Sequence, residues 1–157
     1  MSAIPHHIEA FWQRFLASHP DPLAAQERFY EAFQIGTGEE DADEGVRLIR
    51  CGQKTATSSL LWDYEAEGKP LPQLGSLSVL EDGRNQAACV VETIWLEVLA
   101  FDRVDAEFAR DYGEADGTLE GWRRLCWPYY VDACVPLGRA MSRSAPLVCE
   151  RFRVVFA

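Results

Sequence analysis

The chain has 157 residues, of which 48% are hydrophobic and 25% charged, so it is long and apolar enough for one globular domain and unlike a disordered protein. Fifteen basic residues against 25 acidic ones give a net charge of −10, which argues against tight, phosphate-driven binding to long nucleic acids. The sequence shows no apolar run of membrane-spanning length and no signal peptide, so we expect a cytoplasmic protein that does not contact membranes.

Rare residue types limit the possible chemistry. The five cysteines are odd in number and form no C-x-x-C pair, so we expect buried small residues rather than disulfides or a zinc site. All three histidines lie within the first 19 residues, which argues against a Ser-His-Asp triad or a multi-histidine metal site. We therefore expect no metal and no cofactor. Lys54 and Lys69 are the two lysines, against thirteen arginines, so each lysine is of interest.

The first third of the chain reads as helical. Apolar residues from Ile8 to Leu16 recur at helical spacing, and Asp21-Pro22 begins a second helix that we expect to continue to Phe33. We assign residues 1–35 to an N-terminal helical extension packed on a domain of residues 36–157. The acidic run after Gly38 is typical of the start of a helix. Gly52 is typical of the C-cap that ends such a helix.

After Gly52 the pattern changes from helices to a mixture of strands and helices. Residues 60–72 look irregular, and strands over 76–80 and 86–99 flank an Asp-Gly turn at 82–83. A short helix over 106–112, a helix capped by Thr118 and a final strand over 147–156 follow. This order predicts an α+β protein whose strands form a small mixed β-barrel flanked by helices.

The segment from Gly52 to Ser59 places a lysine among several hydroxyl groups. A hydroxyl is a poor nucleophile unless a base takes its proton, and Lys54 is the nearest candidate base for Thr57. In an extended chain the two side chains would point to opposite faces, so this pairing requires a turn. The alternative is an ordinary loop with Lys54 in solvent.

Two later segments carry further candidate residues. Glu114 and Asp116 lie in a glycine turn before a helix, where they could bind a ligand or, alternatively, cap the helix. Trp122 and Arg123 are followed by Trp127, Tyr129 and Tyr130; such a group could stack a nucleobase, although an aromatic stripe at helical spacing is more often core.

Several segments in order resemble the ASCH (activating signal cointegrator homology) domain family. Residues 52–57, Gly-Gln-Lys-Thr-Ala-Thr, resemble its G-x-K-T-x-T motif. Later blocks resemble the family at Tyr64-Glu65 with Leu71-Pro72, at 113–116 and 119–123, and at 149–152. The likeness extends from about Phe33 to Val155. It implies a PUA-like fold, a small β-barrel with helices around a cleft.

The resemblance also implies a function and a set of site residues. Some bacterial members are amidohydrolases that remove the acyl group from N4-acetylcytidine, in which a lysine, a threonine and a glutamate act together; carried over, these are Lys54, Thr57 and Glu114. The expected substrate-binding residues are Thr55, Ser58, Tyr64, Asp116, Trp122 and Arg123. The expected partner is a small neutral nucleoside, and the expected state a monomer or homodimer. RNA binding or RNA cleavage in the same cleft is the alternative, since other members are ribonucleases.

Two positions depart from the family pattern. Ala115 replaces the second glycine of the common Gly-Glu-Gly-Asp sequence, and Cys126 stands where a histidine often follows the Trp-Arg pair. Glu114 is carried over across a variable region of the family, and Asp116 is its rival for the functional carboxylate. The N-terminal helices are absent from the shortest amidohydrolases of the family.

Overall fold

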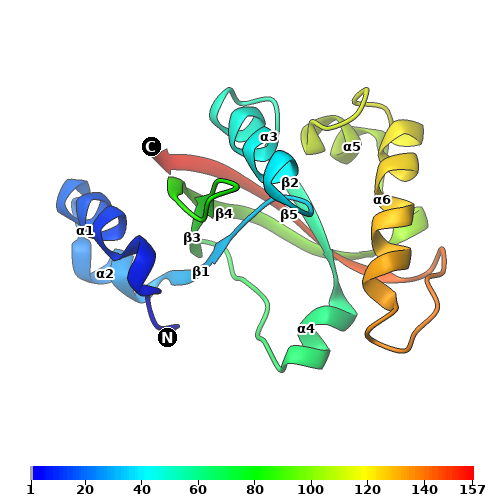
Figure 1. Ribbon diagram of the computed structural model, residues 1–157, viewed down its shortest axis with the longest axis horizontal. Coiled ribbons are helices and arrows are strands. Elements are labelled where there is room, and N and C mark those ends of the chain that lie inside the picture. The colour runs from blue at the N-terminus through cyan, green and yellow to red at the C-terminus, as the bar shows by residue number, and fades with distance from the viewer. Residues whose placement is uncertain (1) are drawn as a thin grey trace. The chain divides into compact units, whose positions relative to one another are not determined.

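The computed structural model describes residues 2–157 and has the expected α+β composition (Figure 1). Among these residues no helix is both long and apolar enough to cross a membrane. In chain order the elements are η1 (His6–Ile8), α1 (Glu9–Ser18), α2 (Pro22–Glu27), β1 (Phe29–Phe33), α3 (Glu39–Arg50), β2 (Ala56–Leu60), α4 (Leu61–Glu67), β3 (Leu77–Glu81), β4 (Ala87–Ala100), η2 (Phe101–Arg103), α5 (Ala106–Tyr112), α6 (Leu119–Cys134) and β5 (Pro146–Phe156).

The five strands form an open sheet in the order β1-β3-β4-β5-β2. Strand β1 pairs in parallel with β3, whereas β3 with β4 and β2 with β5 are antiparallel pairs. The mixed sheet expected from the sequence is therefore present, but β1 and β2 are edge strands, so the sheet does not close into a barrel. Local sequence patterns give strand positions but not whether the two edge strands meet.

The chain divides into two compact units. Unit 1 contains residues 1–52, 72–94 and 152–157, and unit 2 contains residues 53–71 and 95–151. The chain passes back and forth between the units, and β4 and β5 each contribute residues to both.

Unit 1 buries its apolar side chains in two clusters. One joins the N-terminal helices to the sheet, because Trp12 and Phe15 of α1 share it with Val79 of β3 and Val90 of β4. The other places α3 against the same two strands through Val46 and Ile49, among others. The N-terminal segment therefore contributes part of the core of this unit.

The second helix ends earlier than the sequence pattern predicts. Asp21 caps α2 as expected, since its carboxylate accepts a hydrogen bond from the Ala24 amide, but the helix stops at Glu27. The expected helix to Phe33 is wrong: Phe29–Phe33 is β1, paired with β3. Phe29 nevertheless packs on α1, with its ring 5.0 Å from that of Trp12. Pairing with a strand more than forty residues away overrides the local aromatic pattern.

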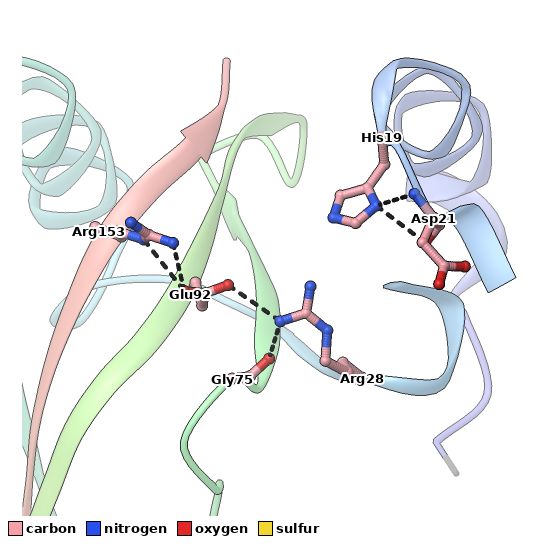
Figure 2. Close-up of polar contacts among 6 residues, drawn as sticks. All are labelled: His19, Asp21, Arg28, Gly75, Glu92 and Arg153. Carbon is pink, nitrogen blue, oxygen red and sulfur yellow. Dashed lines mark hydrogen bonds and ion pairs between the residues drawn. The ribbon is translucent and has the colours of Figure 1, made fainter. Parts of the chain in front are cut away.

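A charged network ties three separate segments of unit 1 together (Figure 2). One carboxylate oxygen of Glu92 in β4 accepts from Arg28 at 3.1 Å, and the other accepts from Arg153 in β5 at 2.9 Å. Arg28 also donates to the Gly75 carbonyl, just before β3. Glu92 thereby links the start of β1 to β4 and β5. Figure 2 also shows His19, whose Nδ1 lies 3.0 Å from the Asp21 amide at the start of α2.

Unit 2 has a single aromatic core in which α5 and α6 pack on β2 and β5. Its centre holds Trp122 and Tyr130 of α6, Phe108 of α5 and Phe101 of η2. The limits of α5 agree with the expected 106–112, and Thr118 caps α6 as expected by accepting a hydrogen bond from the Gly121 amide. The irregular segment expected over 60–72 is only partly so, because it contains α4, which ends at the left-handed Gly68.

Candidate active site

The segment before β2 lies against the C-terminal end of α5. The last carbonyl groups of a helix lack partners within the helix, and here the donors of three consecutive residues satisfy three consecutive carbonyls. The bonds are Gln53 Nε2 to the Gly113 carbonyl (3.0 Å), Lys54 Nζ to the Tyr112 carbonyl (3.1 Å), and Thr55 N to the Asp111 carbonyl (2.8 Å). The negative end of the helix dipole favours a cation at this place, which fits a lysine in the middle position.

Lys54 is buried and forms an ion pair with Glu114. The two side chains approach to 2.7 Å between Nζ and Oε2, with Lys54 fully buried and Glu114 23% exposed. Burial lowers the pKa of Lys54 from 10.5 to about 8, although the Glu114 carboxylate acts in the opposite direction. A lysine in this state has a substantial neutral fraction near physiological pH and can accept a proton. The alternative of an ordinary loop with Lys54 in solvent is therefore excluded.

Gly113 allows the two segments to approach this closely. Its φ of +70° is a left-handed conformation, and a Cβ at this position would lie 2.2 Å from the Gln53 carbonyl oxygen. Only glycine fits both constraints. The pairing of Lys54 with Glu114 thus depends on a glycine immediately before the glutamate.

Further polar groups lie behind Lys54 in the core of unit 2. The ring of Tyr112 has its centroid 3.3 Å from Lys54 Nζ, and its hydroxyl lies beside the Cys126 thiol. Burial raises the pKa of Cys126 to about 12 and that of Tyr112 well above its usual range, so both groups are neutral at physiological pH. Ser58 in β2 is hydrogen-bonded to the Tyr130 hydroxyl. The Trp122 indole nitrogen is buried and has no hydrogen-bond partner within residues 2–157.

The rival carboxylate, Asp116, has a different role. Its Oδ1 accepts hydrogen bonds from the backbone amide and the hydroxyl of Thr118, at 3.0 and 2.7 Å. These bonds lower the pKa of Asp116 and orient the residue that caps α6. Asp116 therefore supports a helix start, and Glu114 is the carboxylate that pairs with Lys54.

Thr57 does not share a turn with Lys54. Residues 56–60 form the extended strand β2, in which Thr57 pairs with Glu150 of β5. The turn that the sequence-based pairing required is absent, because hydrogen bonding to β5 keeps this segment extended. Thr57 is half-buried, and within the described part of the chain its hydroxyl makes no hydrogen bond, so it remains available to a ligand.

The other residues expected at the site lie in different surroundings. Thr55 is held by the Asp111 carbonyl through both its amide and its hydroxyl, at 2.8 and 3.3 Å. Trp122 is 1% exposed and stacks on Phe101 at 5.0 Å, so it serves the core and offers no open face to a base. Arg123 is exposed on α6. Tyr64 of α4 is half-buried, and Lys69 Nζ lies 5.4 Å from the centroid of its ring.

Sequence reasoning missed Tyr112 and gave no role to Cys126 beyond its departure from the family pattern. Tyr112 is the last residue of α5 and directly precedes Gly113-Glu114, a position that signals only a helix end in the sequence. Its contact with Lys54 arises from packing between separate segments. Residues 2–157 contain no cluster of three or more histidine, cysteine, aspartate or glutamate side chains suited to a metal ion.

The fold and the site define an α+β protein with an open mixed sheet and a buried lysine-glutamate pair. A family model of the ASCH domain matches residues 31–156, which is most of the chain, and the chain belongs to this family. The match supports the expected PUA-like fold, with an open sheet in place of the expected barrel.

Two solved structures are similar over nearly the whole chain. One is the ASCH domain from Lactobacillus crispatus JV V101, with 25% identity, a TM-score of 0.91, and coverage of 100% of this chain and 99% of that one. The other is protein EF3133 from Enterococcus faecalis V583, with 27% identity, a TM-score of 0.83, and coverage of 96% and 88%. No curated protein is similar enough to the chain to count as a match.

Proposed function

We propose that the protein is an amidohydrolase that removes the N4-acyl group from nucleosides of the N4-acetylcytidine type. The observation that carries this proposal is the ion pair between Glu114 and the buried Lys54, 2.7 Å apart, in which Lys54 belongs to the segment that resembles the G-x-K-T-x-T motif. A lysine acts as a general base only in its neutral form, and burial lowers the pKa of Lys54 to about 8, close to physiological pH. Membership of the ASCH family supports the substrate class.

In the proposed reaction, the Thr57 hydroxyl oxygen attacks the acyl carbonyl carbon and its proton passes to neutral Lys54, directly or through water. Lys54 then gives a proton to the N4 nitrogen as the carbon-nitrogen bond breaks, which releases the cytidine and leaves the acyl group on Thr57. Water hydrolyses this ester to the free acid and restores Thr57. Glu114 stabilises the charged form of Lys54 between these steps.

The residues that contact the nucleoside follow from accessibility. Of the six expected substrate-binding residues, Arg123 and Asp116 are exposed and Tyr64 is half-buried. Asp116 is hydrogen-bonded to Thr118, so we propose that Arg123 and Tyr64 contact the substrate. Thr55 and Ser58 are engaged by Asp111 and Tyr130, so we propose that they shape the site rather than bind the ligand.

The test is turnover of N4-acetylcytidine by the purified protein, followed by ultraviolet absorbance. We expect Lys54→Ala, Thr57→Ala and Glu114→Gln to lower kcat/KM by at least about 100-fold. Matched controls are Ser59→Ala, a second half-buried hydroxyl of β2, and Glu120→Gln, an exposed glutamate of α6 paired with Arg124. Both controls are expected to stay within about twofold of wild type.

Two results would overturn the proposal. Absence of turnover over a panel of N4-acylcytidines with different acyl groups excludes the proposed reaction. Unchanged turnover in Lys54→Ala excludes the proposed site. Acyl-enzyme formation is checked separately by mass spectrometry of the quenched protein, in which Thr57→Ala should carry no acyl group. Salt-sensitive binding or cleavage of RNA in place of turnover would move the function to the family's other activity.

A further inference from the structure

Tyr112 contacts the Lys54 ammonium group from two directions. Its ring centroid lies 3.3 Å from Nζ, and its backbone carbonyl accepts a hydrogen bond from the same atom at 3.1 Å. The electron-rich face of an aromatic ring attracts a cation, and the attraction is greatest where the cation is desolvated. The Lys54 side chain is fully buried, so this condition is met.

The other groups around Lys54 leave few alternatives for stabilising its charge. Glu114 supplies the opposite charge at 2.7 Å. Among residues 2–157, the other titratable groups described around Lys54 are the Cys126 thiol and the Tyr112 phenol, and burial raises the pKa of each, which keeps both uncharged at neutral pH. Lys54 is thus held in water-excluded surroundings by one carboxylate, one carbonyl and one ring face.

We propose that Tyr112 is a positioning residue, whose ring face and carbonyl keep the Lys54 ammonium charged and within reach of Glu114. Without the ring, only Glu114 and the backbone carbonyl would oppose desolvation, and the neutral amine would be favoured. The consequence for catalysis rests on the proposed function: Tyr112 would set the pH at which Lys54 becomes a base. The consequence for the protonation of Lys54 does not depend on that function.

The scarcity of lysine makes this protonation directly measurable. Because Lys54 and Lys69 are the two lysines of the chain, labelling lysine with carbon-13 at Cε gives two side-chain signals, and Lys69→Arg assigns them. We expect Lys54 in the free protein to titrate near pH 8. Tyr112→Leu removes the ring and should lower this midpoint by about one pH unit, a tenfold change in the acid dissociation constant. Tyr112→Phe keeps the ring and should restore the wild-type midpoint.

Two further variants keep the test decisive. Tyr64→Leu is a matched control, since it removes the ring that lies 5.4 Å from Lys69, and it should leave the Lys54 midpoint unchanged. If Tyr112→Leu does not fold, 3,4,5-trifluorophenylalanine at position 112 replaces it, because this residue keeps the shape of a phenyl ring and weakens its negative face. A Lys54 midpoint that is the same in Tyr112→Phe and in the leucine or fluorinated variant would overturn the proposal.

Catalysis gives a second readout. If Lys54 is the base, kcat/KM rises with pH to a plateau above the Lys54 midpoint. Tyr112→Leu should then move this rise about one pH unit lower, and Tyr112→Phe should not. A shifted titration in a protein without turnover would sustain the role of Tyr112 and reject the amidohydrolase. An unshifted titration in an active protein would support the amidohydrolase and reject the role of Tyr112.

Discussion

Lys54 illustrates at the scale of one residue how a buried ionisable group lowers the stability of a fold. Its pKa is lowered from 10.5 in the unfolded chain to about 8 in the folded protein, so folding favours the neutral amine. The resulting loss of stability is absent above pH 10.5, grows as the pH falls towards 8 and is complete below pH 8. At neutral pH it lowers the free energy of unfolding by about 3 kcal/mol.

Lys54→Met removes this cost with little change in side-chain volume. We expect the variant to be at least as stable as wild type at pH 7 by urea unfolding. Between about pH 8 and 10.5 wild type should gain about 1.4 kcal/mol per pH unit relative to the variant. Taking the difference between the two proteins cancels the titration of the cysteines and tyrosines. A constant difference across this range would show that Lys54 titrates at an ordinary pH.

His7 is a second residue whose role depends on a buried partner. Its Nε2 lies 2.7 Å from the carboxylate of Glu81, a side chain that is only 8% exposed in β3. His7→Ala takes this partner away from a buried carboxylate and should lower the free energy of unfolding by about 1–3 kcal/mol. The neighbouring His6 is 99% exposed and serves as the control. Equal effects of His6→Ala and His7→Ala would contradict this account.

The choice between Glu114 and Asp116 shows what single residues reveal in a sequence. Both lie in the same glycine turn, and both are acidic residues before a helix. Asp116 has a local signal, because Thr118 two residues later begins α6 and binds it. Glu114 has none, since its partner Lys54 is sixty residues away. The family resemblance favoured Glu114, but the pairing itself depends on how α5 and β2 come together.

At the scale of elements, the C-terminal end of α5 organises the site. Gly113→Ala would force a left-handed φ on a residue with a Cβ and bring that atom within 2.2 Å of the Gln53 carbonyl oxygen. We expect Gly113→Ala to lower the free energy of unfolding by at least about 2 kcal/mol more than alanine would at a glycine that has a similar φ but no neighbouring atoms. Gly117 is that control, because its φ is +76° and a Cβ added there would meet no atom within 4 Å.

The comparison of Gly113→Ala with Gly117→Ala separates backbone strain from the close approach, because both variants carry the strain. Denaturant unfolding gives the stability of each, and the Cε signal of Lys54 reports whether its pairing with Glu114 survives. We expect this signal to move in Gly113→Ala alone. Similar losses in the two variants, with an unchanged signal, would show that the 53–54 segment adapts.

Elements with strong local signals were predictable from the sequence, and those set by distant pairing were not. The limits of α5 follow from Asp105 as its cap and Gly113 at its end, both local features. Strand β1 was missed because its aromatic residues also fit a helical spacing, and only the pairing of Phe29 with Leu77 decides between the two. Helix α4 was missed among Gly and Pro residues, although Gly68 gives it an ordinary C-cap.

At the scale of the whole molecule, the order of the chain explains why a boundary after residue 35 is hard to define. Residues 1–52 belong to the same compact unit as residues 72–94 and 152–157. Trp12 in α1 is fully buried, and its indole donates to Gln26 at 2.7 Å. The helices before β1 are therefore part of a core that residues from three parts of the chain complete. The division into an extension and a domain of residues 36–157 stays a prediction.

The net charge of −10 also belongs to the whole molecule, and it distinguishes the two candidate activities. A polyanion is repelled by such a protein unless local contacts to phosphate compensate, and those contacts weaken steeply with salt. The binding of a neutral nucleoside depends on neither effect.

We expect kcat/KM for N4-acetylcytidine to change less than about twofold between about 50 and 500 mM salt. Binding of single-stranded RNA, measured by fluorescence anisotropy, should be weak even at the lower concentration. Tight RNA binding that falls steeply with salt would mean that a local basic site outweighs the overall charge, and it would favour RNA as the natural ligand.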